Sequence, residues 1–209
     1  MNTKIKNRCV TLLAREHGLA SLKELQLSGD FEIVAIFTHK FNPKSYDPEQ
    51  KIRDDFSDFK LFAKENHIPL FTIDSKDEKK VLEKYASEND FEFLISISWR
   101  YLIPPEIFEK AKYGSINLHR GDLPKYAGIE PIKRALMNYE KKIAICSHHV
   151  SENFDEGKVL FKYFHNVNYQ KNMSLEQNID RLKSEITVYF PKLTIKTLRY
   201  LMDDEKYEK

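Results

Sequence analysis

The stretch from Ser115 to Pro131 reads Ser-Ile-Asn-Leu-His-Arg-Gly-Asp-Leu-Pro-Lys-Tyr-Ala-Gly-Ile-Glu-Pro. We interpret its first residues, 115–119, as a strand that ends at His119. Residues two apart on a strand project to the same side, so the Asn117 carboxamide and the His119 imidazole are expected to converge on one small polar group. The stretch therefore predicts a strand with a polar site at its carboxyl end.

On either side of this stretch, short apolar runs alternate with helical patterns. The expected strands are 9–14, 31–38, 69–73, 91–98, 115–119, 143–150 and 158–167. The expected helices contain Leu19, Leu22, Leu25 and Leu27, then Phe56 to Ala63, Val81 to Ala86, Pro131 to Met137, and a long amphipathic helix over Leu175 to Met202 that is interrupted at Pro191. This alternation is typical of an α/β, Rossmann-like, mostly parallel sheet with helices on both faces. Ligands of such sheets bind beyond the carboxyl ends of the strands.

A third polar residue follows the strand expected over 143–150. The sequence there reads Asn153-Phe154-Asp155-Glu156-Gly157, and Asp155 lies 36 residues beyond His119 (155 − 119 = 36). An Asn, a His and an Asp suit acyl-type chemistry in which the enzyme supplies no covalent nucleophile.

The ordered set of Asn117-Leu118-His119, Leu123-Pro124-Lys125-Tyr126 with Gly128, and Asp155-Glu156-Gly157 resembles the signature of the 10-formyltetrahydrofolate-dependent formyltransferases. The resemblance covers about residues 9 to 165. It implies a formyltransferase core and a single catalytic domain over 1–209, with a C-terminal helix from about residue 174.

The resemblance also implies an activity, the transfer of a formyl group from the co-substrate 10-formyltetrahydrofolate to a primary amine without a metal. In this interpretation Asn117 and a protonated His119 donate hydrogen bonds to the developing oxyanion. Asp155 orients His119 or a water and helps to remove the proton from the amine. The sequence leaves open whether His119 or Asp155 takes that proton.

The resemblance assigns further residues to the two substrates. The expected folate-binding residues are Trp99, Arg100, Tyr101 and Leu102 on one wall and Ser151, Asn153 and Phe154 on the other. The expected contacts with the amine substrate are Arg120, Lys125 and Tyr126, with Arg134 as a further candidate. His17 and His39 are within possible reach of a ligand, His148 and His149 are assigned structural roles, and Gly128 is expected to permit an unusual backbone angle.

The amine acceptor is predicted from departures within the family. The segment Ala14-Arg15-Glu16-His17-Gly18 makes a poor phosphate cradle for glycinamide ribonucleotide. Methionyl-tRNA formyltransferases resemble the chain over 128–136 but carry a further C-terminal domain, for which the chain is too short. The remaining branch acts on nucleotide-linked amino-deoxy sugars, which we take as the expected acceptor. Methionyl-tRNA, glycinamide ribonucleotide, and a non-catalytic folate-binding or nucleotide-binding module stay as alternatives.

The composition limits the kinds of partner that we expect for this protein. The 34 basic and 32 acidic residues give a net charge of +2, so no global field favours nucleic acid or an anionic membrane. No segment reaches the ~20 apolar residues of a membrane span, and the polar N-terminus has no apolar run of signal length. Only Cys9 and Cys146 are present, both in apolar runs, which indicates buried, reduced thiols. We therefore expect a cytoplasmic protein, with a homodimer possible.

Overall fold

The computed structural model describes residues 6–45 and 47–207. Residues 1–5, which belong to the polar N-terminus, Tyr46, in the loop 40–54, and residues 208–209 lie outside the described residues. The strands in this part of the chain follow the predicted runs. They are β1 (Asn7–Leu13), β2 (Phe31–Thr38), β3 (Leu70–Thr72), β4 (Phe93–Ile97), β5 (Gly114–His119), β6 (Lys142–His149) and β7 (Val159–Asn166).

These strands form one sheet in the order β3-β2-β1-β4-β5-β6-β7. The pairs from β3 through β5 are parallel, whereas β6 runs antiparallel to both β5 and β7. The mostly parallel sheet predicted from the sequence is confirmed. The chain order reverses between β1 and β4, which is the place where α/β sheets of this kind open a crevice for ligands.

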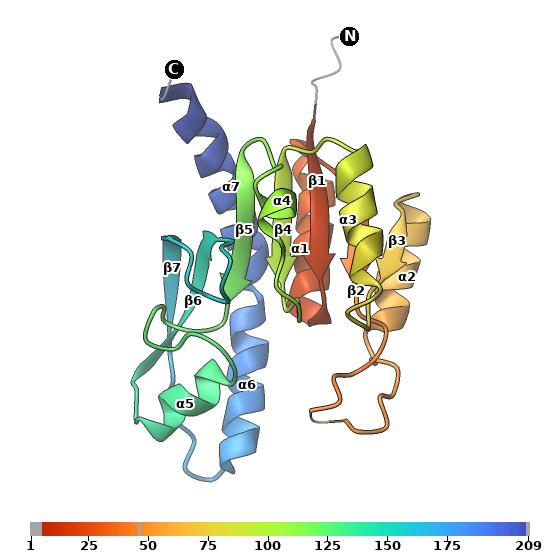
Figure 1. Ribbon diagram of the computed structural model, residues 1–209. Helices are drawn as coiled ribbons and strands as arrows, with labels where there is room; N and C mark the ends of the chain where they lie inside the picture. Colours follow the sequence, from red (N-terminus) through yellow and green to blue (C-terminus); the bar gives the residue numbers. More distant parts are fainter. Residues whose placement is uncertain (1–5, 46, 208–209) are drawn as a thin grey trace.

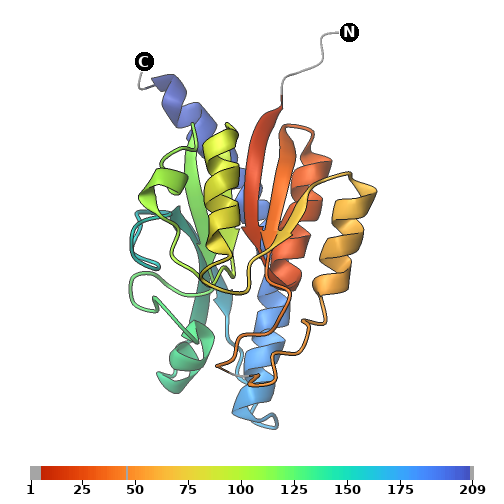
Figure 2. The ribbon, with the colours of Figure 1, turned by 45° about the vertical axis from the view of Figure 1, so that its right-hand side comes forward.

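Helices cover both faces of the sheet, as the sequence predicts (Figure 1). They are α1 (Arg15–Ser28), α2 (Phe56–Glu65), α3 (Lys79–Glu88), α4 (Pro105–Phe108), α5 (Pro131–Met137), α6 (Leu175–Thr187) and α7 (Tyr189–Tyr207). One apolar cluster joins α1, α2, α5, α6 and α7 to the sheet, and a second joins α3 and α4 to it. Figure 2 shows α3 on one side of the strands and α7 on the other.

The first helix illustrates how the apolar pattern selects a face. Leu19, Leu22 and Leu25 recur at helical spacing and are buried, whereas Leu27 is 80% exposed because it falls off that stripe. Gly29 ends the helix in the left-handed conformation, with φ of 72°, as the Ser28-Gly29 pair predicts.

The helical C-terminal segment differs from its prediction in one respect. The long helix α7 is present, but the interruption falls at Val188 rather than at Pro191, so that α6 and α7 are separate helices. Pro191 lies in the first turn of α7, where its missing N–H breaks no hydrogen bond. The start of α6 is fixed by a capping box, because the Ser174 hydroxyl and the Gln177 amide bond each other's backbone N–H groups.

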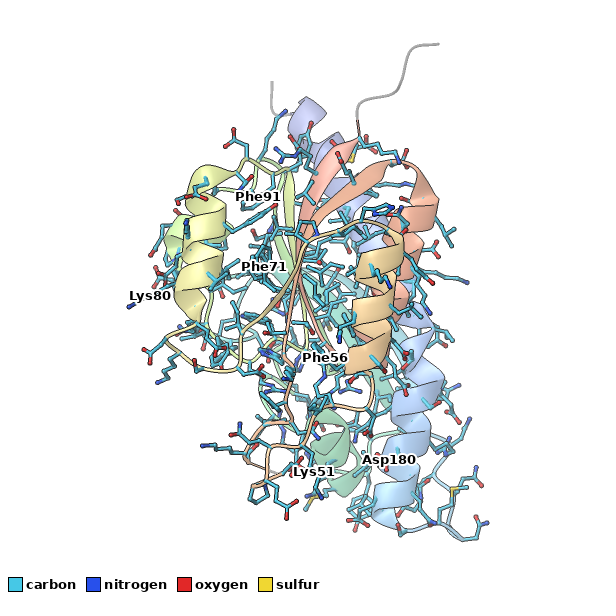
Figure 3. The ribbon with its side chains drawn as sticks, turned by 90° about the vertical axis from the view of Figure 1, so that its right-hand side faces the viewer. Lys51, Phe56, Phe71, Lys80, Phe91 and Asp180 are labelled. Atoms are coloured by element: carbon cyan, nitrogen blue, oxygen red, sulfur yellow. The ribbon has the colours of Figure 1, made fainter. Side chains whose placement is uncertain are left out.

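The strands β1, β2, β4 and β5 end at the lower edge of the molecule in Figure 1, where α5, α6 and the 40–54 loop extend beyond the sheet. Figure 3 shows Lys51 of this loop and Asp180 of α6 at the same end. This arrangement surrounds the ligand-binding edge of the sheet with side chains from distant parts of the sequence. Among the described residues, none of the helices has the length and apolar character that crossing a membrane requires.

Candidate functional site

A cleft of about 630 Å³ opens beside the carboxyl ends of β4 and β5. Its floor contains Ser96, Asn117 and His148, and its walls come from the segments 98–103 and 150–155. The side chains of β4 and β5 reach the cleft because both strands end there, and His148 joins them because it pairs with Asn117 across the antiparallel β5–β6 register.

Asn117 is held by His148. The Asn117 Nδ2–H donates to His148 Nε2 over 2.9 Å, and His148 Nδ1–H donates to the His149 carbonyl over 2.8 Å. With its Nδ1 proton engaged in this way, His148 accepts at Nε2, which also lies 3.5 Å from Asp155 Oδ1. The contact fixes the orientation of the Asn117 amide and leaves its second N–H in a long contact of 3.4 Å with Asp155 Oδ1.

His119 and Asp155 meet at the end of β5. The His119 Nδ1 atom lies 3.2 Å from Asp155 Oδ2, and His119 Nε2–H donates to the Tyr126 carbonyl over 2.8 Å. Since a carbonyl only accepts, Nε2 carries a proton in this geometry. One further proton can then bind between His119 Nδ1 and the Asp155 carboxylate.

Asp155 is presented to the cleft by an unusual backbone. Its φ is 58°, in the left-handed region. Gly128, opposite, has a φ of 83°, and an unusual backbone angle was expected at this glycine. The Gly128 N–H donates to Asp155 Oδ2 over 2.8 Å. Burial acts to raise the pKa of Asp155, but its contacts with His148, His119 and the Gly128 N–H together lower that pKa.

The protonation of His119 differs from the prediction. Burial lowers the pKa of His119 below its usual value, although the Asp155 charge and the Tyr126 carbonyl oppose the shift. At neutral pH the imidazole is therefore neutral and Asp155 is ionised. The resting site accepts a proton, whereas the sequence interpretation began with a protonated His119.

One wall of the cleft is the segment that follows β4. The residues expected to bind folate on this side all line it: Trp99, Arg100, Tyr101 and Leu102. Trp99 stacks on His39 with ring centroids 4.4 Å apart and planes inclined by 23°, so His39 lies behind the tryptophan. The wall offers a flat aromatic face that is braced from the sheet side.

Arg100 is fixed within this wall. Its guanidinium donates to the Phe41 carbonyl over 2.5 Å and lies 3.9 Å from Asp74 Oδ1. Burial lowers the pKa of Arg100 to about 10, while Asp74 opposes the shift. Arg100 thereby ties the cleft wall to the 40–54 loop.

The opposite wall comes from the loop between β6 and β7. Ser151, Asn153 and Phe154 line the cleft, and Phe154 is 53% exposed. The Ser151 hydroxyl donates to the Asn153 carbonyl over 3.0 Å, and the Asn153 amide donates to Glu156 over 2.8 Å. Gly157 closes the loop, since a Cβ there would meet the His149 carbonyl oxygen at 1.7 Å.

The residues expected to bind the amine substrate separate into two groups. Arg120 lines the cleft. Lys125 and Tyr126 do not: both side chains bond Glu140 at a neighbouring hollow of about 40 Å³, and the Tyr126 ring is buried. The structure corrects their placement, because the turn after Arg120 directs them toward α5. Arg134 is likewise engaged, with the Ala127 carbonyl.

Three further polar residues line the cleft, namely His148, His17 and Ser98, and of these His17 was expected within reach of a ligand. His148 had been given a structural role, and its place opposite Asn117 depends on an antiparallel register that no local pattern reveals. His17 lines the cleft and lies with Nε2 2.8 Å from the Ser98 hydroxyl. Ser98 itself has φ of 56°, a backbone state that only the folded chain discloses. Across residues 6–45 and 47–207, no three His, Cys, Asp or Glu side chains are grouped to hold a metal ion.

Fold and cleft together define a doubly wound α/β protein with an Asn-His-Asp site beside the carboxyl ends of β4 and β5. The Formyl transferase family matches residues 12–191, and the chain belongs to this family.

Comparison with curated proteins gives relatives of the same class. The chain is 31% identical to the methionyl-tRNA formyltransferase of Orientia tsutsugamushi (strain Boryong), over 89% of the chain and 57% of that protein. It is 30% identical to the methionyl-tRNA formyltransferase of Thermodesulfovibrio yellowstonii, over 88% of the chain and 56% of that protein. The chain thus spans little more than half the length of these relatives.

Solved structures share the fold. A formyltetrahydrofolate deformylase from Pseudomonas syringae superposes with a TM-score of 0.72 at 19% identity, covering 96% of this chain and 63% of that one. A phosphoribosylglycinamide formyltransferase from Bacillus halodurans gives a TM-score of 0.68 at 18% identity, covering 93% and 95%. At this level of identity the likeness concerns the fold alone.

Proposed function

We propose that this protein is an N-formyltransferase, which transfers the formyl group of 10-formyltetrahydrofolate to a primary amine. The observation that carries the proposal is the convergence of Asn117, His119 and Asp155 on one cleft, where Asp155 contacts both of the other side chains. Family membership and the formyl-transferring relatives support it. The assignment of the activity to one domain is supported by the single sheet that β1 to β7 form.

The amine is the nucleophile, so the protein needs no nucleophilic side chain. Attack on the formyl carbon places negative charge on the carbonyl oxygen and positive charge on the amine nitrogen. The Asn117 N–H that bonds His148 holds the carboxamide in place, and the second N–H, 3.4 Å from Asp155, is available to the oxyanion. Such a preorganised donor is commonly worth roughly 3–4 kcal/mol of transition-state stabilisation.

The proton that leaves the amine goes to the His119–Asp155 pair. His119 Nδ1 is an acceptor in the resting site, and the neighbouring carboxylate stabilises the imidazolium that forms. Once charged, His119 stabilises the oxyanion electrostatically and returns its proton to the folate nitrogen as the carbon–nitrogen bond breaks. The formyl carbon keeps its oxidation state, and one proton moves from acceptor to leaving group.

The folate co-substrate is assigned to the two walls. The Trp99 face and the apolar side chain of Leu102 suit a flat heterocycle, and the segment with Ser151, Asn153 and Phe154 lies opposite. This places the formyl group toward the cleft floor, where Asn117 and His119 lie.

The acceptor is proposed from the comparisons. The expected nucleotide-linked amino sugar has no counterpart among the relatives described above, which are named methionyl-tRNA formyltransferases. A structural neighbour is a phosphoribosylglycinamide formyltransferase. These names favour the alternatives over the sugar, and we take the methionyl group of charged tRNA as the first acceptor to test and glycinamide ribonucleotide as the second.

The test is an absorbance assay of folate release from 10-formyltetrahydrofolate. The reaction is run with charged initiator tRNA, glycinamide ribonucleotide, thymidine-diphosphate or uridine-diphosphate amino sugars, or no amine. Formylation of one acceptor confirms an N-formyltransferase and names its substrate. Folate release without any amine would instead indicate a hydrolase.

Folate binding without turnover of any acceptor would favour a non-catalytic module and overturn the proposal. The matched variants are His119→Ala and Asp155→Asn, which should abolish turnover, and Glu65→Ala, at an exposed position at the end of α2, which should not. Circular dichroism and thermal melting of all three establish that the fold is intact.

A further inference from the structure

Arg120 follows β5 directly and borders three hollows. Its side chain lines the main cleft, the small hollow near Glu140, and a groove of about 370 Å³ between α5 and α6. The groove contains Pro131, Ile132, Lys133, Ile179 and Lys183 among its lining residues. Arg120 therefore stands where the main cleft continues into the α5–α6 groove.

The guanidinium of Arg120 makes no hydrogen bond or ion pair with any of the described residues, although it carries five N–H donors. Burial lowers the pKa of Arg120 to about 10, and the charge of Arg15 acts in the same direction. The group remains charged at neutral pH. A partly desolvated cation without a counter-ion is costly, so this position is unfavourable unless a ligand compensates it.

Most of the neighbouring charges are compensated; the exception is Glu176 of the α5–α6 groove, which has no ion pair among the described residues. Around the groove, Lys133 lies 3.4 Å from Glu130, and Lys183 lies 3.0 Å from Asp180. In the small hollow, Asp122 pairs with Lys162 at 2.7 Å. Glu140 there is bonded by both Lys125 and Tyr126.

In the main cleft, Asp155 is occupied by His119 and the Gly128 N–H. Arg100, the other arginine of the cleft, has Asp74 and a carbonyl as partners. Among the arginines that line the main cleft in the described chain, Arg120 thus stands apart in having no acidic partner.

We propose that Arg120 binds a phosphate group of the amine acceptor at the junction of the cleft and the α5–α6 groove. The planar guanidinium presents two parallel N–H groups that match two oxygens of a phosphate, and this bidentate contact is both strong and directional. The acceptor amine then lies beside His119, its phosphate lies at Arg120, and the rest of the acceptor continues along α5 and α6. This inference rests on the proposed function for the identity of the ligand, but the anion site itself does not.

The first test therefore needs no turnover. Inorganic pyrophosphate is titrated into the protein without folate, and binding is followed by calorimetry. Wild type should bind one equivalent, Arg120→Gln should bind at least about tenfold more weakly, and Arg120→Lys should be intermediate, since an ammonium keeps the charge but loses the fork. Arg199→Gln is the matched control, because that guanidinium pairs with Asp30 outside the cleft.

Equal affinity of wild type and Arg120→Gln for pyrophosphate would overturn the inference, as would equal loss in Arg199→Gln. Thermal melting checks that each variant is folded. If Arg120→Gln does not fold, Arg120→Lys carries the test, and its affinity must fall below that of wild type.

The second test uses the acceptor found in the folate-release assay. Arg120→Gln should raise the KM for a phosphate-bearing acceptor about tenfold or more, while the KM for 10-formyltetrahydrofolate changes by less than about threefold. An equal rise in both constants would contradict the assignment. If no acceptor turns over and pyrophosphate binding still depends on Arg120, the proposed function fails and the anion site stands. A phosphate-free acceptor that is used as well as its phosphorylated form would overturn the inference and leave the function intact.

Discussion

The imidazole of His119 lies between two groups. Its Nε2–H donates to the Tyr126 carbonyl, and its Nδ1 faces the Asp155 carboxylate, which stabilises a proton on the ring. Burial lowers its pKa all the same. We expect the His119 ring signal in a histidine NMR titration to titrate below the usual value of about 6.5. In Asp155→Asn the pKa should fall further, because the carboxylate that raises it is gone.

The proposed role of His119 determines the direction in which activity changes with pH. If neutral His119 accepts the amine proton, kcat/KM is constant at neutral pH and falls as the pH drops through the lowered pKa. An acidic limb at or above pH 6.5, or a His119 pKa that rises in Asp155→Asn, would contradict this assignment. Gln in place of His67, an exposed histidine beyond α2, should leave the limb unchanged.

Gly121 is needed for the position of the His119 ring. A Cβ at this glycine would lie 2.5 Å from His119 Nε2 and 2.5 Å from the Tyr126 carbonyl oxygen, the two atoms that form one hydrogen bond. We expect Gly121→Ala to displace one of them and to lower kcat by about 10²-fold, the usual consequence of about 1 Å of misplacement in a catalytic group.

The control for Gly121→Ala is Gly29→Ala. A Cβ at Gly29 meets nothing within 4 Å, although its φ is 72°. This variant should lose about 1 kcal/mol of stability from backbone strain and keep its activity. Similar kcat losses in both variants would indicate a general rather than a local effect.

For individual residues, the sequence predicted those placements that follow from strand geometry alone. Asn117 and His119 share a face because they are two residues apart on β5, and both reach the cleft. The place of His148 depends on the β5–β6 register, and Lys125 turns away because of the chain path after Arg120. Neither the register nor the path has a local signal in the sequence, so both were missed.

Arg53 is a buried anchor of the 40–54 loop. Arg53 is 1% exposed, and its guanidinium bonds both Asp55 carboxylate oxygens, at 2.9 and 2.8 Å, as well as the His39 carbonyl at 2.6 Å. Removing Asp55 leaves a buried cation without its counter-ion, which typically costs about 3–5 kcal/mol. We expect this loss in the free energy of unfolding of Asp55→Ala, measured by urea denaturation.

The neighbouring Asp54→Ala is the matched control, because Asp54 is exposed. It should change the unfolding free energy by less than about 1 kcal/mol. Equal losses in the two variants would show that the Arg53 contact does not stabilise the loop. Since Pro43 and Ser45 of the loop line the cleft, a loosened loop should also weaken ligand binding there.

The elements themselves were predicted well where periodicity was long and uninterrupted. The strand over 31–38 matches β2, and the helix over 131–137 matches α5. The boundary between α6 and α7 at Val188 was placed at Pro191 instead, since proline is the stronger local signal but is tolerated in a first turn. The single turn α4 was too short to show a period.

Across the whole molecule, the cleft exists because four distant segments end at one edge of the sheet. The chain brings 96–103, 117–120, 128–131 and 148–155 together there. The sequence predicted that edge from strand order and the Asn-His-Asp motif, but the contacts between the segments depend on tertiary packing. The same packing buries three histidines and lowers their pKa values, namely His17, His39 and His119. The stability of the fold therefore depends on pH.

This burial predicts a loss of stability in mild acid. Burial lowers the pKa of His39 to about 3, and its Nε2 atom has no hydrogen-bond partner among the described residues. Between pH 6.5 and 3 the unfolded chain binds a proton at this residue that the folded protein does not. The free energy of unfolding therefore falls with falling pH, by about 1.4 kcal/mol per unit for each such histidine.

The measurement is urea unfolding at pH 7.5, 6.0 and 5.0, above the range in which most carboxylates titrate. Wild type should lose stability steadily over this range, and His39→Gln should show a shallower slope even though its stability at pH 7.5 is lower. The exposed His67→Gln variant should keep the wild-type slope. A His39→Gln slope as steep as that of wild type would mean that His39 takes up its proton in the folded state as readily as in the unfolded chain, which its burial behind Trp99 and its unpartnered Nε2 argue against.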